Sequence, residues 1–233
     1  MNTENLPQQF VDELLFTHNG FTAQLCCSPT SQSLAYALRY RAYRHIDSIP
    51  INSNELLYDE FDGQANVRTH LLWYEGEAVA TVRSCIWSKK YDWAPTESVR
   101  AFWSDTHRQI GLQHNILESC RFALSPNFKG RKSLSAQLLL FRIQDLSSQI
   151  DQCRHIITAV RQKHVSFYQR MLGFQQISEP IRLPWVDAEI VLLTVSQAKS
   201  RQVVIEKGMP PCKEEEVKRY QNLSQQIQRH ATA

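Results

Sequence analysis

A strand, a long apolar helix and a second strand follow one another in the middle of the chain, and this succession constrains the fold most. Residues 117–124 form an apolar extended run, residues 133–150 carry an apolar face at helical spacing, and residues 156–160 form a short buried run. Each element has an apolar surface that must be buried against another element. The pattern therefore predicts a sheet covered by helices.

The flanking segments extend this sheet. Residues 67–74 and 78–87 are extended runs on either side of Glu75-Gly76-Glu77 and predict a hairpin, with a helix over residues 31–45 before it. After the central strands we expect a helix over 164–172 that ends at Gly173, followed by strands at 174–177 and 188–195. This order predicts an α+β fold: a mixed sheet with helices on both faces, in three αβα layers.

Size and composition set the domain organisation. The 233 residues, 42% of them hydrophobic, suit a single domain over residues 1–233. Residues 209–233, which include Pro210 and Pro211, predict a peripheral polar helix or tail. No run is long and apolar enough to span a membrane, and the polar start of the chain indicates a cytoplasmic protein.

Charge and motif content exclude several classes of protein. Twenty-six basic and 23 acidic residues give a net charge of only +3, which does not indicate nucleic-acid binding. The six cysteines form no C-x-x-C pair and no histidine cluster accompanies them, so we expect reduced thiols and no metal site. No histidine stands in a recognisable nucleophile motif, which disfavours a covalent triad.

A basic turn precedes the long helix. Lys129, Gly130, Arg131 and Lys132 stand between the central strand and the helix, with Ser133 after them. The first backbone N–H groups of a helix have no partner within the helix, and glycine permits close approach, so an anion such as a phosphate suits this position. An ordinary solvated loop is the alternative.

Charged residues within apolar strands are the second set of candidates. Glu118 lies in an apolar strand, where a half-buried carboxylate has a raised pKa suited to a general base, or else is a structural partner in an ion pair. Arg121 would face the opposite side of the strand unless a bulge intervenes. Burying Arg83 requires an acidic partner, which Asp59 and Asp62 could supply, although these two also fit a surface turn.

These residues resemble a known motif set in its order along the chain. The set consists of an arginine and an aromatic residue on an early helix, two aspartates three apart, an arginine on a hairpin strand, and Glu-x-x-Arg-Phe on the next strand. The corresponding residues are Arg41 with Tyr43 or Tyr40, Asp59, Asp62, Arg83, Glu118, Arg121 and Phe122. From about residue 39 to residue 174 the chain resembles the N-acyl amino acid synthases and the related acyl-homoserine-lactone autoinducer synthases, which share a GNAT-like fold.

The resemblance implies an N-acyltransferase that moves a long acyl group from a pantetheine thioester to the amine of an amino acid or similar small molecule. It implies Glu118 as the base, with Arg83 and Arg121 holding the acceptor carboxylate or ordering the acidic cluster. Donor binding is expected at Phe122, Ala123, Leu124, Lys129, Gly130, Arg131, Lys132, Ser133 and Tyr168. Acceptor and acyl-chain contacts are expected at Arg41, Asp59, Asp62, Phe102 and Trp103.

The thioester is already activated, so direct attack needs no tightly bound cofactor. A turn with few glycines suits the single phosphate of acyl carrier protein, an acidic partner, although coenzyme A is the other possible donor. Three alternatives stay open: an S-adenosylmethionine-dependent autoinducer synthase, a short-chain coenzyme A acetyltransferase, and an inactive relative that binds carrier protein or lipid. The stretch from Ile46 to Pro50 lacks the tryptophan usual in the first of these.

Overall fold

The computed structural model describes residues 8–183 and 188–231. Its strands form a mixed sheet, and the fold is α+β, as the sequence predicts. The strands are β1 (Leu14–His18), β2 (Phe21–Leu25), β3 (Val67–Tyr74), β4 (Glu77–Trp87), β5 (Ile116–Leu124), β6 (His155–Arg161), β7 (Gln175–Gln176), β8 (Ile181–Arg182) and β9 (Glu189–Ser196). The helices are α1 (Pro29–His45), α2 (Glu97–Arg100), α3 (Trp103–Gln109), α4 (Arg131–Ile150), α5 (Val165–Leu172), α6 (Gln197–Glu206) and α7 (Glu214–Ala231), and the 3-10 turns are η1 (Gln8–Glu13), η2 (Lys89–Tyr91) and η3 (Gln162–His164).

The chain forms two compact units. The first consists of residues 1–83, 121–143 and 212–233, and the second of residues 84–120 and 144–211. Strands β4 and β5 and helix α4 each contribute residues to both units. Each unit is described by itself below.

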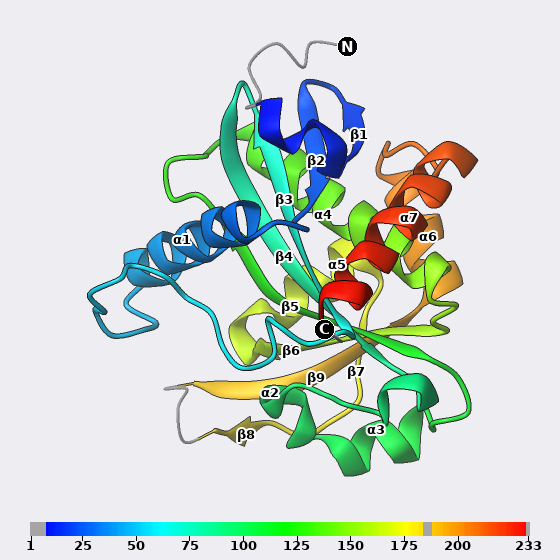
Figure 1. Ribbon diagram of the computed structural model, residues 1–233. Coiled ribbons are helices and arrows are strands. Elements are labelled where there is room, and N and C mark those ends of the chain that lie inside the picture. The colour runs from blue at the N-terminus through cyan, green and yellow to red at the C-terminus, as the bar shows by residue number, and fades with distance from the viewer. Residues whose placement is uncertain (1–7, 184–187, 232–233) are drawn as a thin grey trace. The chain divides into compact units, whose positions relative to one another are not determined.

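The first unit is built around a meander with the strand order β1-β2-β3-β4, in which β2 pairs antiparallel with β1 and β3. Helix α1 packs against β3 (Figure 1). It begins at a capping box in which the hydroxyl groups of Ser28 and Ser31 bond each other's backbone N–H, and Pro29 follows the cap. The hairpin of β1 and β2 was not among the predicted elements.

Helix α7, in the segment predicted as a polar helix or tail, makes buried polar contacts within the first unit. Its Tyr220 is fully buried, and the hydroxyl lies 2.8 Å from His70 Nε2 on β3. Glu216 forms an ion pair with the buried Arg142 of α4 at 2.6 Å, and Ser224 accepts a hydrogen bond from Arg68 Nε at 3.1 Å. Burying these polar groups requires partners, so α7 is a structural part of the first unit.

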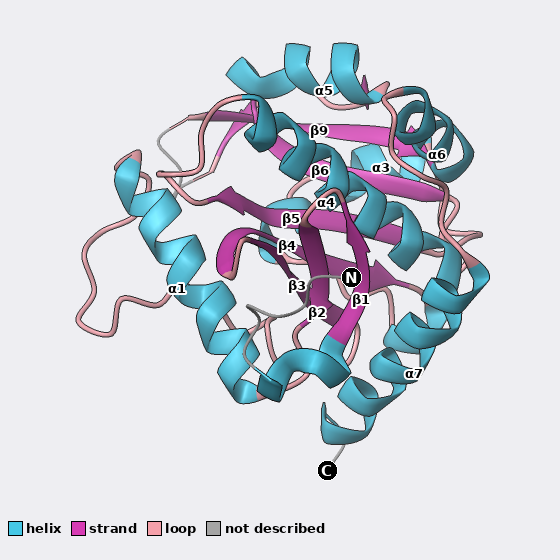
Figure 2. Ribbon diagram, turned by 90° about the horizontal axis from the view of Figure 1, so that it is seen from above, coloured by secondary structure: helices cyan, strands magenta, loops and turns pink. Residues whose placement is uncertain are grey.

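In the second unit β5 pairs in parallel with β6, and β6 pairs antiparallel with β9, which also pairs with β7 and β8. Helix α6 contacts β6, β9 and α5 (Figure 2). The ladder between β5 and β6 runs from Ile116↔His155 to Glu118↔Ile157. Helix α5 ends at Gly173, as predicted, because the φ of +72° at this residue suits glycine. Among the described residues, no helix has the length and hydropathy of a membrane span.

Candidate active site

The first unit contains a chain of ion pairs between three arginines and two aspartates. Arg39 Nη1 lies 2.7 Å from Asp62 Oδ1, and Asp62 Oδ2 lies 3.0 Å from Arg83 Nη1. The same Arg83 nitrogen is 2.6 Å from Asp59 Oδ1, while Asp59 Oδ2 accepts a hydrogen bond from Arg121 Nη2 at 2.6 Å. The sequence prediction that Arg83 pairs with the two aspartates is confirmed.

Four segments distant in sequence supply this ionic chain: α1, the loop before β3, β4 and the end of β5. The loop is shaped by its own aspartates, because Asp59 Oδ1 accepts the Phe61 N–H and Asp62 Oδ2 accepts the Asp59 N–H. Asp62 is thus fixed by backbone and side-chain donors together.

The helix arginine in the ionic chain is Arg39 and not Arg41, which is exposed. Arg39 is fully buried and also donates from Nη2 to Thr69 Oγ1 at 2.9 Å. It stands four residues after the buried Ala35, so helical periodicity places both on one face. That spacing was the signal in the sequence that could have selected Arg39.

Solvent reaches the ionic chain at one end. The side chains of Arg39, Arg83 and Asp62 are at most 3% exposed, whereas Asp59 is 22% and Arg121 is 29% exposed. Burial raises the pKa of Asp59, but hydrogen bonds and charge from Arg83 and Arg121 outweigh it and hold that pKa well below its usual value. Burial lowers the pKa of Arg121, while Tyr43 and Asp59 raise it, and the net shift is upward.

Arg121 interrupts the regular geometry of β5. Its φ is +52°, in the left-handed region that a non-glycine residue seldom adopts. A strand with such a residue loses the simple alternation of its side chains. Strand β5 therefore does not keep regular geometry through Arg121.

Glu118, in the second unit, is fully enclosed rather than half-buried. Oε2 accepts hydrogen bonds from Trp87 Nε1 at 2.9 Å and from the Thr96 N–H at 3.1 Å, and Oε1 accepts one from the Thr96 hydroxyl. Donors from Trp87 and Thr96 thus meet both carboxylate oxygens at a position without solvent access. The sequence predicted a half-buried carboxylate, and the structure buries it completely.

Aromatic side chains extend from this carboxylate in the second unit. The Trp87 ring stacks on Trp103 at a centroid distance of 5.6 Å. Phe102 is buried and occupies the N-cap position of α3. Its carbonyl accepts hydrogen bonds from the hydroxyl and the N–H of Thr106. Trp103 is only half-buried and has surface to offer a ligand. Trp87 was not among the predicted site residues, because its position at the end of an apolar strand gave no functional signal.

The basic turn lies in the first unit, where the connection from β5 meets the first turn of α4. Gly130 has a φ of +82°, and its carbonyl accepts the Ser133 N–H and hydroxyl at 3.1 and 2.8 Å. Lys129, Arg131 and Lys132 are exposed. The turn thus presents cationic side chains at the start of α4, as an anion site requires.

An aromatic cluster braces this turn. The Phe128 ring lies 6.0 Å from Phe21 of β2 and 5.7 Å from Tyr74 of β3, and these two rings are 4.8 Å apart. Lys132 Nζ lies 4.0 Å from the centre of the Tyr74 ring and 3.7 Å from Glu75. Lys132 is therefore drawn toward the hairpin, and Lys129 and Arg131 carry the remaining positive charge.

The other residues expected to contact the donor lie on different elements. Phe122 stacks on Phe141 of α4 at 5.3 Å, and beside it on β5 Ala123 is buried and Leu124 half-buried. Tyr168, on α5 of the second unit, packs edge-on against Phe174 at 5.4 Å. In the first unit the structure brings Phe122, Ala123 and Leu124 together with Arg121 and the basic turn, because one segment carries them all.

Comparison with known proteins decides the family. A family model described as N-acyl amino acid synthase FeeM matches residues 34–196, well over half of the chain. This chain belongs to the FeeM family of N-acyl amino acid synthases. It is therefore an N-acyltransferase. The matched segment contains the whole ionic chain, Glu118 and the basic turn.

Solved structures share the fold of this FeeM-family chain. The N-acyl amino acid synthase FeeM from uncultured soil microbes has a TM-score of 0.64 and 15% identity, over 78% of this chain and 93% of that one. The acyl-homoserine-lactone (AHL) synthase LasI has a TM-score of 0.63 and 16% identity, over 85% and 100%. MesI, described as a CoA-dependent acyl-homoserine lactone synthase, has a TM-score of 0.53 and 19% identity, over 76% and 87%.

At such identities these likenesses show the fold, which is the GNAT-like fold that the sequence predicted. A search of curated protein sequences found no match.

Proposed function

We propose that the protein transfers an acyl group from a pantetheine thioester directly to the amine of an amino acid, whose carboxylate pairs with Arg121. The observation that carries this proposal is the partly exposed guanidinium of Arg121, at the end of an ionic chain whose other two arginines are buried. Three arginines against two aspartates leave the chain with one net positive charge. A carboxylate ligand would complete its neutralisation.

Pre-organisation supports this role for Arg121. Its side chain is held by Asp59, which Arg83 holds in turn, so little side-chain entropy remains to be lost when a ligand binds. Within the described residues, its hydrogen bond to Asp59 uses one terminal nitrogen, Nη2. A guanidinium has five N–H donors, so others can meet a carboxylate.

The donor is proposed to lie along the end of β5 and the basic turn. Arg121 lies on β5, which ends at Leu124, and the basic turn follows in the same unit before α4. An acceptor bound at Arg121 and a phosphate bound at Lys129 and Arg131 would thus lie along one short segment of the chain.

Acyl carrier protein is the proposed donor, because its single phosphate and acidic surface suit Lys129 and Arg131. The same proposal includes a long acyl chain that contacts Phe102 and Trp103, and a role for Tyr168 in donor binding. It also includes a cytoplasmic location.

An α-amino group with a pKa near 8 is partly neutral at physiological pH and needs only modest help to attack. We therefore propose that the enclosed Glu118 positions Trp87 and Thr96, rather than serving as the direct base first expected.

The proposal is tested by measuring thiol release from acyl-carrier-protein and coenzyme A thioesters, with amino acids, S-adenosylmethionine, and the amines that lack the carboxylate of each amino acid. Wild type should prefer an amino acid to its decarboxylated analogue. Arg121→Gln should remove most of this preference by raising KM for the amino acid, whereas Arg41→Gln on the exposed face of α1 should preserve it. Equal preference in wild type and Arg121→Gln would refute the assignment, and no turnover with any pair would refute the function.

A further inference from the structure

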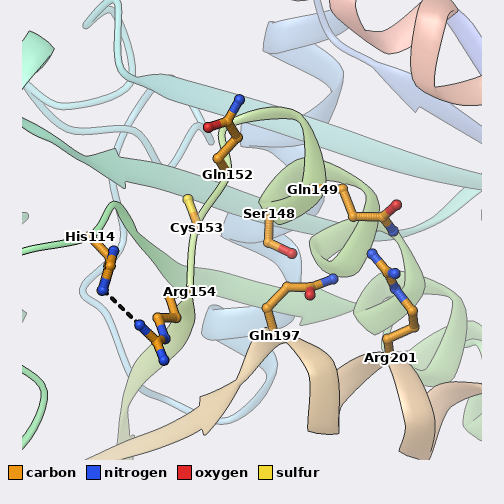
Figure 3. Close-up of a pocket in the computed structure, with 8 residues that line it drawn as sticks. All are labelled: His114, Ser148, Gln149, Gln152, Cys153, Arg154, Gln197 and Arg201. Atoms are coloured by element: carbon orange, nitrogen blue, oxygen red, sulfur yellow. Dashed lines mark hydrogen bonds between the residues drawn. The ribbon is translucent and has the colours of Figure 1, made fainter.

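We propose that an open polar pocket in the second unit binds a small oxyanion, a carboxylate or phosphate group. Its volume is about 500 Å³, within the usual range for small-molecule sites (Figure 3). The pocket is lined by His114, Ser148, Gln149, Gln152, Cys153, Arg154, Gln197 and Arg201. None of these residues was expected at the acyltransferase site. Gln197 and Arg201 also lie beyond the segment that matches the FeeM family.

Main-chain hydrogen bonds hold the walls of the pocket together. The Arg154 N–H donates to the Asn115 carbonyl before β5, and the Arg154 carbonyl accepts the Gln197 N–H at the start of α6, both at 2.9 Å. The Cys153 N–H donates to the Ser148 carbonyl near the end of α4 at 2.8 Å. The pocket is therefore a feature of three fixed backbone segments.

The lining of the pocket is cationic. It includes Arg154 and Arg201 but no aspartate or glutamate. The carboxylate of Asp145 is buried and accepts hydrogen bonds from the side-chain amides of Gln149 and Gln197 at 2.9 and 2.7 Å. These two hydrogen bonds hold the amide groups in place, and the carboxylate that accepts them is shielded from solvent.

Both guanidinium groups retain capacity for a ligand. Arg201 forms an ion pair with Asp145 Oδ2 at 3.6 Å, but at this distance its buried Nε has no hydrogen-bond acceptor. Arg154 Nη1 donates to His114 Nε2 at 2.7 Å, and this acceptor nitrogen brings no negative charge to the arginine (Figure 3). Guanidinium groups match the planar oxygens of carboxylates and phosphates, which selects an oxyanion as the ligand.

The test uses inorganic phosphate and succinate as probes, with sodium chloride of equal ionic strength as the reference. The protein carries Lys129→Gln and Arg131→Gln, so that the basic turn does not contribute. The arginine Nε–Hε resonances are followed by NMR and assigned by substitution. At least one probe should shift the Arg154 and Arg201 signals saturably, and Arg154→Gln should weaken its binding by about tenfold or more.

Arg170→Gln, on the exposed surface of α5 in the same unit, is the matched control and should change the dissociation constant less than twofold. Binding by phosphate alone assigns a phosphate ligand, and binding by succinate alone assigns a carboxylate. Shifts that do not saturate beyond the chloride reference, or equal affinity in Arg154→Gln and the control, would overturn the proposal. A melting curve confirms that each variant is folded, and Arg201→Gln serves as a second probe of the same site.

Discussion

Replacing Glu118 by glutamine and by alanine distinguishes a positioning role from a role as the base. In Glu118→Gln, the amide oxygen can take the place of Oε2 and accept the N–H groups of Trp87 and Thr96, while the amide nitrogen donates to the Thr96 hydroxyl, which then acts as the acceptor. The hydrogen bonds survive without their charge assistance, at a cost of about 1 kcal/mol. For a chain of this size the melting temperature should fall by roughly 2–4 °C.

In Glu118→Ala, the N–H groups of Trp87 and Thr96 lose their acceptor at a position without solvent access. Each unsatisfied buried donor costs about 1–3 kcal/mol. A total of about 3 kcal/mol corresponds to a fall of roughly 6–12 °C in melting temperature. The alanine variant should therefore lose both stability and activity.

Activity separates the two roles, because removing a general base costs about 10²–10⁴-fold in rate. If Glu118 is a positioning residue, Glu118→Gln should keep kcat/KM within about tenfold of wild type and leave the shape of its pH profile unchanged. The assay is thiol release across pH 6–9, with thermal unfolding measured on the same samples. A loss of 100-fold or more in kcat/KM, with an altered pH profile and a melting temperature only a few degrees lower, would refute the positioning role. Glu118 would then be assigned as the general base.

Other consequences of the site can be measured on single variants. Arg39→Ala removes one of the two arginines that pair with the buried Asp62 and should lower the free energy of unfolding by about 3 kcal/mol. The exposed Arg41→Ala should change it by less than about 0.5 kcal/mol in denaturant melts. Because the folded-state pKa of Asp59 is depressed, its contribution to stability is present above its unfolded pKa near 4 and is lost as the pH falls below that value. In Asp59→Asn, the free energy of unfolding should therefore decrease less steeply as the pH is lowered below about 4. An unchanged slope would contradict this. Phe128→Ala removes the ring that braces the basic turn and should raise KM for the donor several-fold with little change in kcat or in KM for the acceptor; equal effects on both substrates would indicate general damage.

Local patterns were sufficient to predict most regular elements. The strands β3, β4, β5, β6 and β9 and the helices α1, α4 and α5 lie where periodicity and turn residues predicted them, because each has a continuous apolar face and clear ends. The hairpin of β1 and β2 was missed because its two strands are only five residues each and lie in a mixed segment. Helix α6 was missed because its short run of residues has a weak apolar face.

The sequence by itself determined the family, the order of the central strands and helices, and the identity of Asp59, Asp62 and Arg83 as partners, since a buried arginine demands acidic neighbours. Only the tertiary structure decided that Arg39 rather than Arg41 joins them, because the choice depends on which face of α1 meets β3. It also decided that Glu118 is closed off. The reason is physical: ion pairs and burial depend on contacts between residues 22 to 62 positions apart, and no local pattern of residues specifies such contacts.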